Sequence, residues 1–301
     1  MTDTTTAASP DWDVLIVGRS FAGLSAALTL GRARRSVIVV GSGGPRNEAV
    51  EHAHGLLTRD HESPGDLIAT AEAQLARYPN VELADDRVLG IEAVSGTGFR
   101  ASIGKRSTTA ATVVLATGAN DDPLPIPGLA EHWGRGVYTC PFCDGWEHQD
   151  LHLAVVGEPE FVPHLAGVLT NWTDRVTVFG VELDTASRAA LAGRGVVVED
   201  RAVRRVIGDG AAVTAVELID GDVVEVGALF HARLPIPNAG LAVALGCSTG
   251  PYGFVVVDET CRTDVDGVWA VGDLARRAHQ MAFAIADGVT AGSQIVGRLI
   301  G

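Results

Sequence analysis

The sequence predicts an α/β protein of two domains, each built on a parallel βαβ unit, with the second domain inserted into the first. A buried-strand pattern, Asp13–Gly18, leads through a glycine-containing turn into a helix-like segment and then a second apolar strand, Ser36–Val40. The same succession restarts in the middle of the chain, with predicted strands at His152–Gly157 and Arg175–Gly180. The length of 301 residues also favours two domains over one.

The remaining predicted elements follow the same plan. Proline-containing connections at Asp121–Leu129 and His231–Gly240 lead into and out of the second domain. We therefore expect a first domain of residues 1–120 plus 239–301 and an inserted domain of residues 121–238. The first domain's other predicted elements are a helix at 22–33, strands at 81–86, 112–118 and within 253–273, and a C-terminal helix.

The composition excludes several classes of partner and location. The net charge of −14 argues against nucleic acid or an anionic membrane surface as partner. There is no uninterrupted apolar run long enough to cross a membrane, and the N-terminus lacks the basic and apolar regions of a signal peptide. Four cysteines are too few for a disulfide-stapled secreted fold, so we expect a cytoplasmic protein.

A glycine turn, Gly18–Gly23, follows the first predicted strand at the place of a phosphate-binding turn in a Rossmann-like fold. Its glycines would let the backbone approach a pyrophosphate at the helix N-terminus. Ser20 replaces the middle glycine and can still donate a hydrogen bond. A plain strand–helix turn is the alternative interpretation.

The acidic residue that usually holds a ribose about twenty positions further on is missing, because Gly41 stands there. Ser42, Arg46 and Asn47 are the expected substitutes.

Two further motifs, one in the middle of the chain and one near its C-terminus, indicate which dinucleotide is bound. Residues 263–273, which end in Gly272-Asp273, resemble the second FAD motif of the two-dinucleotide-binding flavoproteins, and Thr117-Gly118 matches another short motif of that family. The resemblance implies that Asp273 contacts FAD; a helix N-cap is its alternative role. The residues expected to hold FAD are Gly18, Ser20, Phe21, Ala22, Gly23, Ser42, Arg46, Asn47, Thr117, Gly118, Gly272, Asp273 and Gln280.

Cys140 and Cys143 stand in the stretch VYTCPFCDGWE and could form a metal knuckle, a structural disulfide or a redox centre. A metal site needs a second ligand pair, and Cys247 and Cys261 lie in the other predicted domain, where we expect them to be buried. With the FAD motifs, the whole chain from residue 11 resembles the low-molecular-weight thioredoxin reductase family, which carries a CxxC-Asp-Gly element early in the inserted domain.

This resemblance implies roles for the site residues. Cys143 would be the sulfur next to the flavin, Cys140 the thiol that meets the substrate, and Asp144 the general acid or base. A helix N-terminus at the pair would stabilise a thiolate. His279, which precedes Gln280 in a segment that resembles the family's flavin edge, is the preferred catalytic histidine; His148 and His152 are further candidates.

The expected nucleotide turn of the inserted domain departs from the family pattern. Glu158, Pro159 and Glu160 would oppose a pyrophosphate, and Glu182 and Asp184 stand where a 2′-phosphate needs basic residues, with only Arg188 later. This departure points away from NADPH. The chain is similar to the dithiol oxidases of this family, and the resemblance implies that it forms disulfides in small natural products and passes electrons through FAD to oxygen.

Two alternatives to the dithiol oxidase remain. One is a thioredoxin-disulfide reductase fed by NADPH or another donor, and the other is a non-catalytic flavin-binding sensor. The cysteine pair argues against the sensor. The expected partners are a small-molecule dithiol or disulfide, or thioredoxin, and a second copy of the chain in a homodimer.

Overall fold

The computed structural model describes residues 9–42, 44–96, 98–210 and 212–301. The α/β class with two parallel sheets is confirmed. The chain forms two compact units: unit 1 comprises Met1–Arg46, Pro64–Asn120 and Pro235–Gly301, and unit 2 comprises Asn47–Ser63 and Asp121–Leu234. Residues 1–8, on which the expectation of no signal peptide rests, lie outside the described range.

Unit 1 is built on a seven-stranded sheet in the order β3-β2-β1-β6-β5-β4, with β17 paired to β6. The pairs among β3, β2, β1, β6 and β17 are parallel, and β4 and β5 extend the sheet as an antiparallel hairpin. The strands are β1 Trp12–Val17, β2 Val37–Val40, β3 Val81–Ala84, β4 Val88–Val94, β5 Gly98–Ile103, β6 Arg106–Leu115 and β17 Val268–Ala270.

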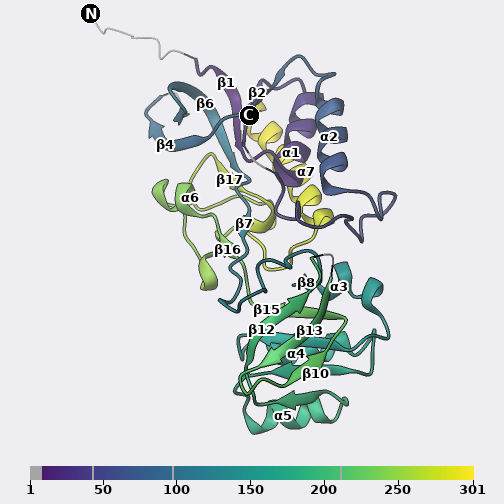
Figure 1. Ribbon diagram of the computed structural model, residues 1–301. Helices are drawn as coiled ribbons and strands as arrows, with labels where there is room; N and C mark the ends of the chain where they lie inside the picture. The colour runs from purple at the N-terminus through teal and green to yellow at the C-terminus, as the bar shows by residue number, and fades with distance from the viewer. Residues whose placement is uncertain (1–8, 43, 97, 211) are drawn as a thin grey trace, which may run out of the picture. The chain divides into compact units, whose positions relative to one another are not determined.

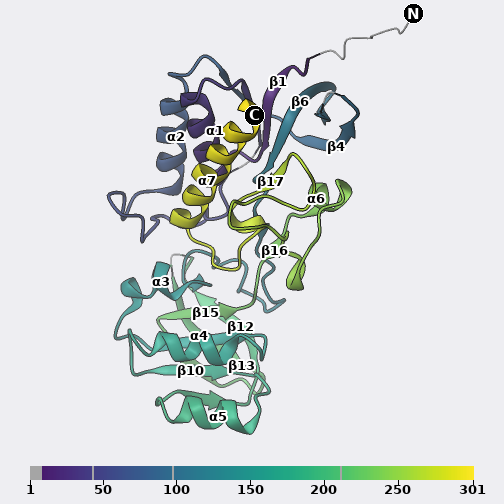
Figure 2. The ribbon, with the colours of Figure 1, turned by 180° about the vertical axis from the view of Figure 1, so that it is seen from behind.

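Three helices of unit 1, α1 (Phe21–Arg32), α2 (Pro64–Leu75) and α7 (Met281–Ile300), lie side by side in both views (Figure 1, Figure 2). Glycines allow α7 to approach α1 closely, because a Cβ at Gly288 would stand 2.3 Å from the carbonyl oxygen of Ala22. A Cβ at Gly292 would likewise meet the side chain of Thr29 at 2.9 Å. The C-terminal helix therefore packs against the start of α1, where the glycine turn lies.

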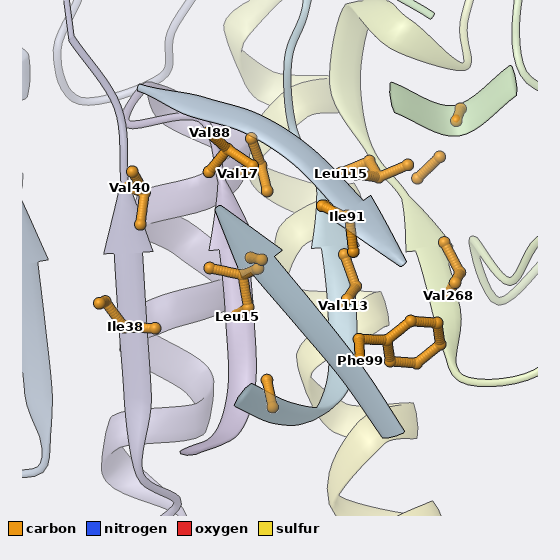
Figure 3. Close-up of a cluster of buried hydrophobic side chains, with 14 of the residues drawn as sticks. Leu15, Val17, Ile38, Val40, Val88, Ile91, Phe99, Val113, Leu115 and Val268 are labelled. Atoms are coloured by element: carbon orange, nitrogen blue, oxygen red, sulfur yellow. The ribbon is translucent and has the colours of Figure 1, made fainter. Parts of the chain in front are cut away.

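Both faces of the unit 1 sheet are covered, which explains the uninterrupted apolar run of β1. Val14 and Ile16 pack with the helices. Leu15 and Val17 point to the opposite face, where they join a second cluster with the hairpin residue Phe99 (Figure 3). This packing fixes the ends of β1, β2 and β6, at which the candidate site is assembled.

Unit 2 has a five-stranded parallel sheet in the order β11-β10-β9-β15-β8 and a three-stranded antiparallel sheet, β12-β13-β14. Its strands are β8 Val137–Tyr138, β9 Leu153–Gly157, β10 Val176–Phe179, β11 Val197–Glu199, β12 Val203–Gly208, β13 Val213–Leu218, β14 Val223–Glu225 and β15 Ala228–Ala232. Its helices are α3 Pro141–Asp144, η1 Trp146–His148, α4 Val162–Leu169 and α5 Thr185–Ala192. The second βαβ unit, β9-α4-β10, is thus present as expected.

Short elements complete unit 1. They are β7 Ala119–Asn120, β16 Ile236–Pro237, α6 Gly240–Ala244, η2 Pro251–Gly253 and η3 Gly272–Leu274. No helix among the described residues is long and apolar enough to cross a membrane.

The prediction of strands within residues 253–273 was wrong except at β17. Residues 254–264 form only isolated bridges, Thr249 to Val255 and Arg262 to Trp269. Asp258 accepts hydrogen bonds from the backbone N–H groups of Thr260 and Arg262, at 2.8 and 3.0 Å. These local bonds hold the backbone in a turn and remove its donors from a sheet ladder.

Candidate functional site

The glycine turn at the start of unit 1 is a close backbone crossing. Gly18 has φ +121°, and a Cβ there would lie 2.0 Å from the carbonyl oxygen of Ala116. A Cβ at Gly23 would lie 2.0 Å from the carbonyl oxygen of Gly18. Ser20 is the N-cap of α1, and its side chain makes no capping hydrogen bond in the described structure. The first-turn amides of α1 therefore lack a side-chain cap, as suits a helix end that receives a phosphate group.

Asp273 lies against a second predicted cofactor residue. Its Oδ2 atom pairs with Nη1 of Arg46 at 3.1 Å, and both side chains are mostly buried. Asp273 is not the helix N-cap considered from the sequence, because it lies inside η3, whose N-cap is Val271. The pairing of Arg46 with Asp273 brings together two segments that are far apart in the sequence.

The buried carboxylate of Asp287 holds the turn that carries Asp273. Asp287 is 2% exposed and accepts hydrogen bonds from the Arg276 guanidinium at 2.6 and 2.5 Å. It also accepts one from the backbone N–H of Gly272 at 3.2 Å. Gly272 has φ +68°, a conformation that favours glycine.

The other predicted cofactor residues of unit 1 lie at the same sheet edge or in the turns that follow it. Thr117 donates its hydroxyl to the carbonyl of Asn238 at 2.9 Å, and Gly118, with φ +65°, has open space where a Cβ would point. Phe21 and Ala22 begin α1, and Gln280 is the N-cap of α7. Ser42 follows β2 and is exposed. Asn47, by contrast, packs with unit 2.

The structure explains why an acid is missing at position 41 and shows where carboxylates are instead. A Cβ at Gly41 would lie 2.7 Å from the backbone nitrogen of Arg19. Gly41 lines a hollow of about 220 Å³ together with Arg19, Ile68, Glu72 and Asp85, among others. Glu72 is bonded to Arg19 at 2.5 Å, which leaves Asp85 as the better acceptor for ribose hydroxyls.

Asp85 was missed from the sequence, although a signal existed. It directly follows β3, which pairs with β2 in parallel so that Ala84 stands opposite Val40. The carboxyl ends of parallel strands meet at one edge, so an acid after β3 is placed beside Gly41. The glycine cradle, the first-turn amides and this hollow together fit FAD.

The redox pair of unit 2 is formed as expected. Cys140 and Cys143 are joined in a disulfide with their Cα atoms 5.3 Å apart. Cys140 is the N-cap of the short helix α3, and its carbonyl accepts hydrogen bonds from the backbone N–H groups of Cys143 and Asp144, both at 3.2 Å. Glycine is required at position 145, because a Cβ there would lie 2.9 Å from the ring of Trp172. The helix turn holds both sulfurs and the Asp144 carboxyl on one short segment.

Asp144 has the ionisation expected of a general acid or base near neutral pH. Burial, and to a smaller extent the charge of Glu147, raises the pKa of Asp144 to about 7. Burial and the neighbouring Asp144 also raise the pKa of Tyr138. His148 lies against Tyr138, with ring centroids 5.0 Å apart, and burial lowers the pKa of His148. The pKa of Asp144 thus lies near physiological pH, whereas the pKa values of Tyr138 and His148 are moved away from it.

The other candidate histidines differ in their surroundings. His152 bonds through Nδ1 to the carbonyl of Glu225 and through Nε2 to the hydroxyl of Thr177, both at 2.9 Å, which is a structural role. His279 belongs to unit 1, where Nε2 contacts the carbonyl oxygen of Arg276 at 2.5 Å and the ring lies 5.7 Å from that of Phe254. Its catalytic role stays a prediction.

Cys247 and Cys261 are free and buried, as expected. Burial raises the pKa of both thiols, to about 12 for Cys261. The described residues contain no group of histidine, cysteine or acidic side chains that could hold a metal ion.

The nucleotide turn of unit 2 has few amides to offer a phosphate. The N–H of Glu158 is bonded to the carbonyl of Ala232 at 2.9 Å, and Pro159 has no N–H. Gly157 is required for packing, because a Cβ there would lie 2.3 Å from the Ala232 carbonyl oxygen. Arg233, the nearby cation, pairs with Glu158 at 3.0 Å and with Asp122 at 2.9 Å. The amide of Glu158 and the guanidinium of Arg233 are therefore both engaged by neighbouring residues of the protein.

At the expected 2′-phosphate position, Asp184 and Arg188 likewise bond to other residues of the protein. Asp184 caps α5 by accepting the N–H of Ser187 at 2.7 Å, and Glu182 is exposed. Arg188 is bonded to the carboxylate of Asp200 and to the carbonyl of Leu183. The only late basic residue singled out from the sequence is therefore already paired.

Comparison with known proteins identifies the class to which this arrangement belongs. A family model described as pyridine nucleotide-disulphide oxidoreductase matches residues 12–288. Thioredoxin reductase aclD of Aspergillus oryzae is 30% identical, over 97% of this chain and 98% of that protein. The protein is thus a flavin-dependent thiol/disulfide oxidoreductase, and the family implies FAD as its cofactor.

Solved structures agree over the whole fold. An oxidoreductase from Agrobacterium tumefaciens is 37% identical with a TM-score of 0.89, and covers 96% of this chain and 98% of its own. HlmI is 33% identical with a TM-score of 0.91, over 96% of this chain and 92% of its own. The chain belongs to the pyridine nucleotide-disulphide oxidoreductase family, in its thioredoxin reductase-like group.

Proposed function

We propose that this protein oxidises small-molecule dithiols to disulfides through the Cys140–Cys143 pair, with oxygen as the final electron acceptor. The observation that carries this proposal is the nucleotide turn of unit 2. Glu158 and Glu160 put negative charge there, Pro159 removes a donor, and the remaining cation, Arg233, is neutralised by Glu158 and Asp122. A polyanionic cofactor such as NADPH would meet repulsion and few amides.

The chemistry of the disulfide follows from its segment. A substrate thiolate attacks the sulfur of Cys140, the Cys140–Cys143 bond breaks, and the second substrate thiol then displaces Cys140 to close the product disulfide. The substrate loses two electrons and two protons, and the protein disulfide gains the two electrons. Asp144, with its pKa near 7, accepts the proton of the first substrate thiol and passes it to the Cys143 thiolate, and the proton of the second substrate thiol goes to the Cys140 thiolate.

FAD, when bound, would supply a two-electron carrier between the cysteine pair and oxygen. Gly18, Gly23 and the α1 N-terminus would hold its pyrophosphate, Asp85 its ribose, and Arg46 with Asp273 the polar chain near Gly272. The complete reaction converts one dithiol and one oxygen molecule into one disulfide and one hydrogen peroxide. A homodimer in the cytoplasm is the expected form.

A thioredoxin-disulfide reductase is the second candidate, because the relative aclD is named a thioredoxin reductase. Anaerobic mixing separates the two. The purified yellow protein is mixed in turn with NADPH, NADH and a small dithiol, and the flavin absorbance is followed. We expect the dithiol to bleach the flavin and, under air, to produce hydrogen peroxide. Fast bleaching by dilute NADPH, with reduction of thioredoxin in the same mixture, would refute the oxidase.

A further inference from the structure

The segment Asn47–Ser63 lies between β2 and α2 in the sequence of the first predicted domain, yet it packs with unit 2. It folds back on itself, because Ala53 donates its N–H to the carbonyl of Glu62 at 2.8 Å. It also lies closely against the chain that leads to β8: a Cβ at Gly134 would stand 2.8 Å from the backbone of Ala49. Its side chains are therefore neighbours of the redox segment.

Three histidines of this segment form a group. The rings of His52 and His61 are stacked at 4.0 Å, and the ring of His54 lies 5.3 Å from that of His61. His54 is mostly buried, with 15% of its side chain exposed, and stands between two carboxylates. Its Nε2 atom is 3.5 Å from Oε1 of Glu147, and its Nδ1 atom is 3.7 Å from Oδ1 of Asp60.

Glu147 connects the histidine group electrostatically with Asp144, which follows the reacting Cys143 directly in the sequence. It lies in η1, one turn after Asp144, and its negative charge acts on Asp144 and on His148. Tyr138 also faces Asp144, and α4, which packs against α3, carries an exposed histidine, His164. Of these neighbours, Glu147 is the group whose charge reaches both Asp144 and His54.

We propose that His54 is a positioning residue of the redox site: its imidazolium pairs with Glu147 and so sets the net charge that Asp144 meets beside the disulfide. The inference rests on the proposed function in one respect, the use of Asp144 as the proton acceptor. The contact between His54 and Glu147 thereby links the segment Asn47–Ser63 to proton transfer at the cysteines.

The proposal predicts that the replacement of His54 and the replacement of Glu147 shift the pH midpoint of Asp144 in opposite directions. Without His54, the charge of Glu147 is uncompensated and the ionisation of Asp144 moves to higher pH. Without the charge of Glu147, it moves to lower pH. A partly exposed ion pair of this kind corresponds to a shift of about half a pH unit. When both groups are replaced, His54 has no partner through which to act, so the midpoint equals that of the Glu147 variant alone.

The test measures thiol exchange at the disulfide and not turnover. The FAD-loaded protein is mixed anaerobically with dithiothreitol, the reaction is stopped by acid, and newly reduced cysteines are alkylated and quantified by mass spectrometry. At each pH, the exchange rate of Asp144→Asn is subtracted from that of the protein that keeps Asp144. The pH dependence of this difference reports the ionisation of Asp144. We expect His54→Gln to raise its pH midpoint by about half a unit and Glu147→Gln to lower it by a similar amount. The double variant should match Glu147→Gln.

His52→Gln is the matched control, because it removes a ring of the same histidine group that stacks on His61 and, in the described part of the chain, pairs with Glu51 and not with Glu147. Its midpoint should equal that of the unchanged protein. The proposal is overturned if His54→Gln leaves the midpoint unchanged, if it still shifts the midpoint in the Glu147→Gln background, or if His52→Gln shifts it equally. Oxygen uptake with a small dithiol, measured separately, tests the oxidase: an NADPH-driven protein would refute that function and leave these midpoints as expected.

Discussion

Asp287→Asn should destabilise unit 1 more than the loss of the exposed ion pairs that Asp266 makes near the other end of α7. Asp287 lies near the start of α7, is 2% exposed, and accepts three hydrogen bonds, two from Arg276 and one from the N–H of Gly272. Asparagine keeps the shape but presents an NH₂ group to these donors and carries no charge. The turn that carries Asp273 then loses its anchor.

The magnitude follows from the number and kind of bonds. A hydrogen bond to a charged group contributes about 1.5–3 kcal/mol, and breaking a buried pair costs about 3–5 kcal/mol. Arg276 is half-exposed and regains water, so we expect a loss near the lower values, about 2–3 kcal/mol. For a 301-residue protein, with an unfolding entropy of about 2.1 cal/mol/K per residue, that corresponds to a fall in Tm of roughly 3–5 °C.

Asp266→Asn is the control. Asp266 lies opposite the other end of α7 and pairs with Arg298 at 2.7 Å and with Arg262 at 2.6 Å, but it is 65% exposed. Exposed pairs contribute at most about 1 kcal/mol each. Thermal unfolding by circular dichroism and the release of flavin fluorescence on heating measure both variants. Equal losses in the two variants, or an Asp287 variant that retains FAD and Tm unchanged, would refute the reasoning.

Three further predictions concern the redox segment and the nucleotide turn. Cys143→Ser should abolish reduction of the flavin by a dithiol, and Cys140→Ser should abolish attack by the substrate, while both variants keep FAD; full turnover by either, measured as oxygen uptake, contradicts the assigned roles. Asp144→Asn should remove the rise of dithiol oxidation through about pH 7, because the carboxyl group is a base only above its raised pKa; an unchanged pH profile speaks against it. Replacing Glu158 and Glu160 together by glutamine should leave flavin reduction by NADPH slow, since the amide of Glu158 remains bonded to Ala232 and proline still follows; stopped-flow absorbance that shows fast reduction would mean that charge alone closes the turn.

The parallel sheets could be predicted from the sequence because both of their faces are buried. Strands such as β1 and β9 are continuous apolar runs, and a glycine or turn marks each end. The β4–β5 hairpin and the β12–β14 sheet were not predicted. Strands β4 and β12 show neither a continuous apolar run nor a strict alternation of buried and exposed residues, so they lack the usual sequence signal of a strand. Residues 254–264 show the opposite failure: Val255, Val256 and Val257 resemble a strand, but Asp258 directs the following backbone into a turn.

The candidate site was predictable where chemistry depends on neighbours in sequence. The cysteine pair with Asp144 lies on one helix turn, and Gly18 and Gly23 lie on one strand–helix turn, so spacing alone was informative. The contact of Arg46 with Asp273 was not predicted, because the two segments meet only after the sheet has formed. Asp85 required one more step, the parallel register that sets the end of β3 beside the end of β2.

The segment Asn47–Ser63 marks the limit of sequence reasoning in this chain. Its histidines carry no motif, and its position between β2 and α2 assigns it to the first domain, where a role beside the cysteines would not be sought. In the structure the segment belongs to unit 2. It folds back on itself through the hydrogen bond between Ala53 and Glu62, and His54 lies against Glu147. Burial and the charge of Glu147 raise the pKa of Asp144 to about 7, and Glu147 lies against His54, which comes from a segment distant in sequence. The ionisation of Asp144 therefore depends on how unit 2 is folded and not on the CxxC motif alone.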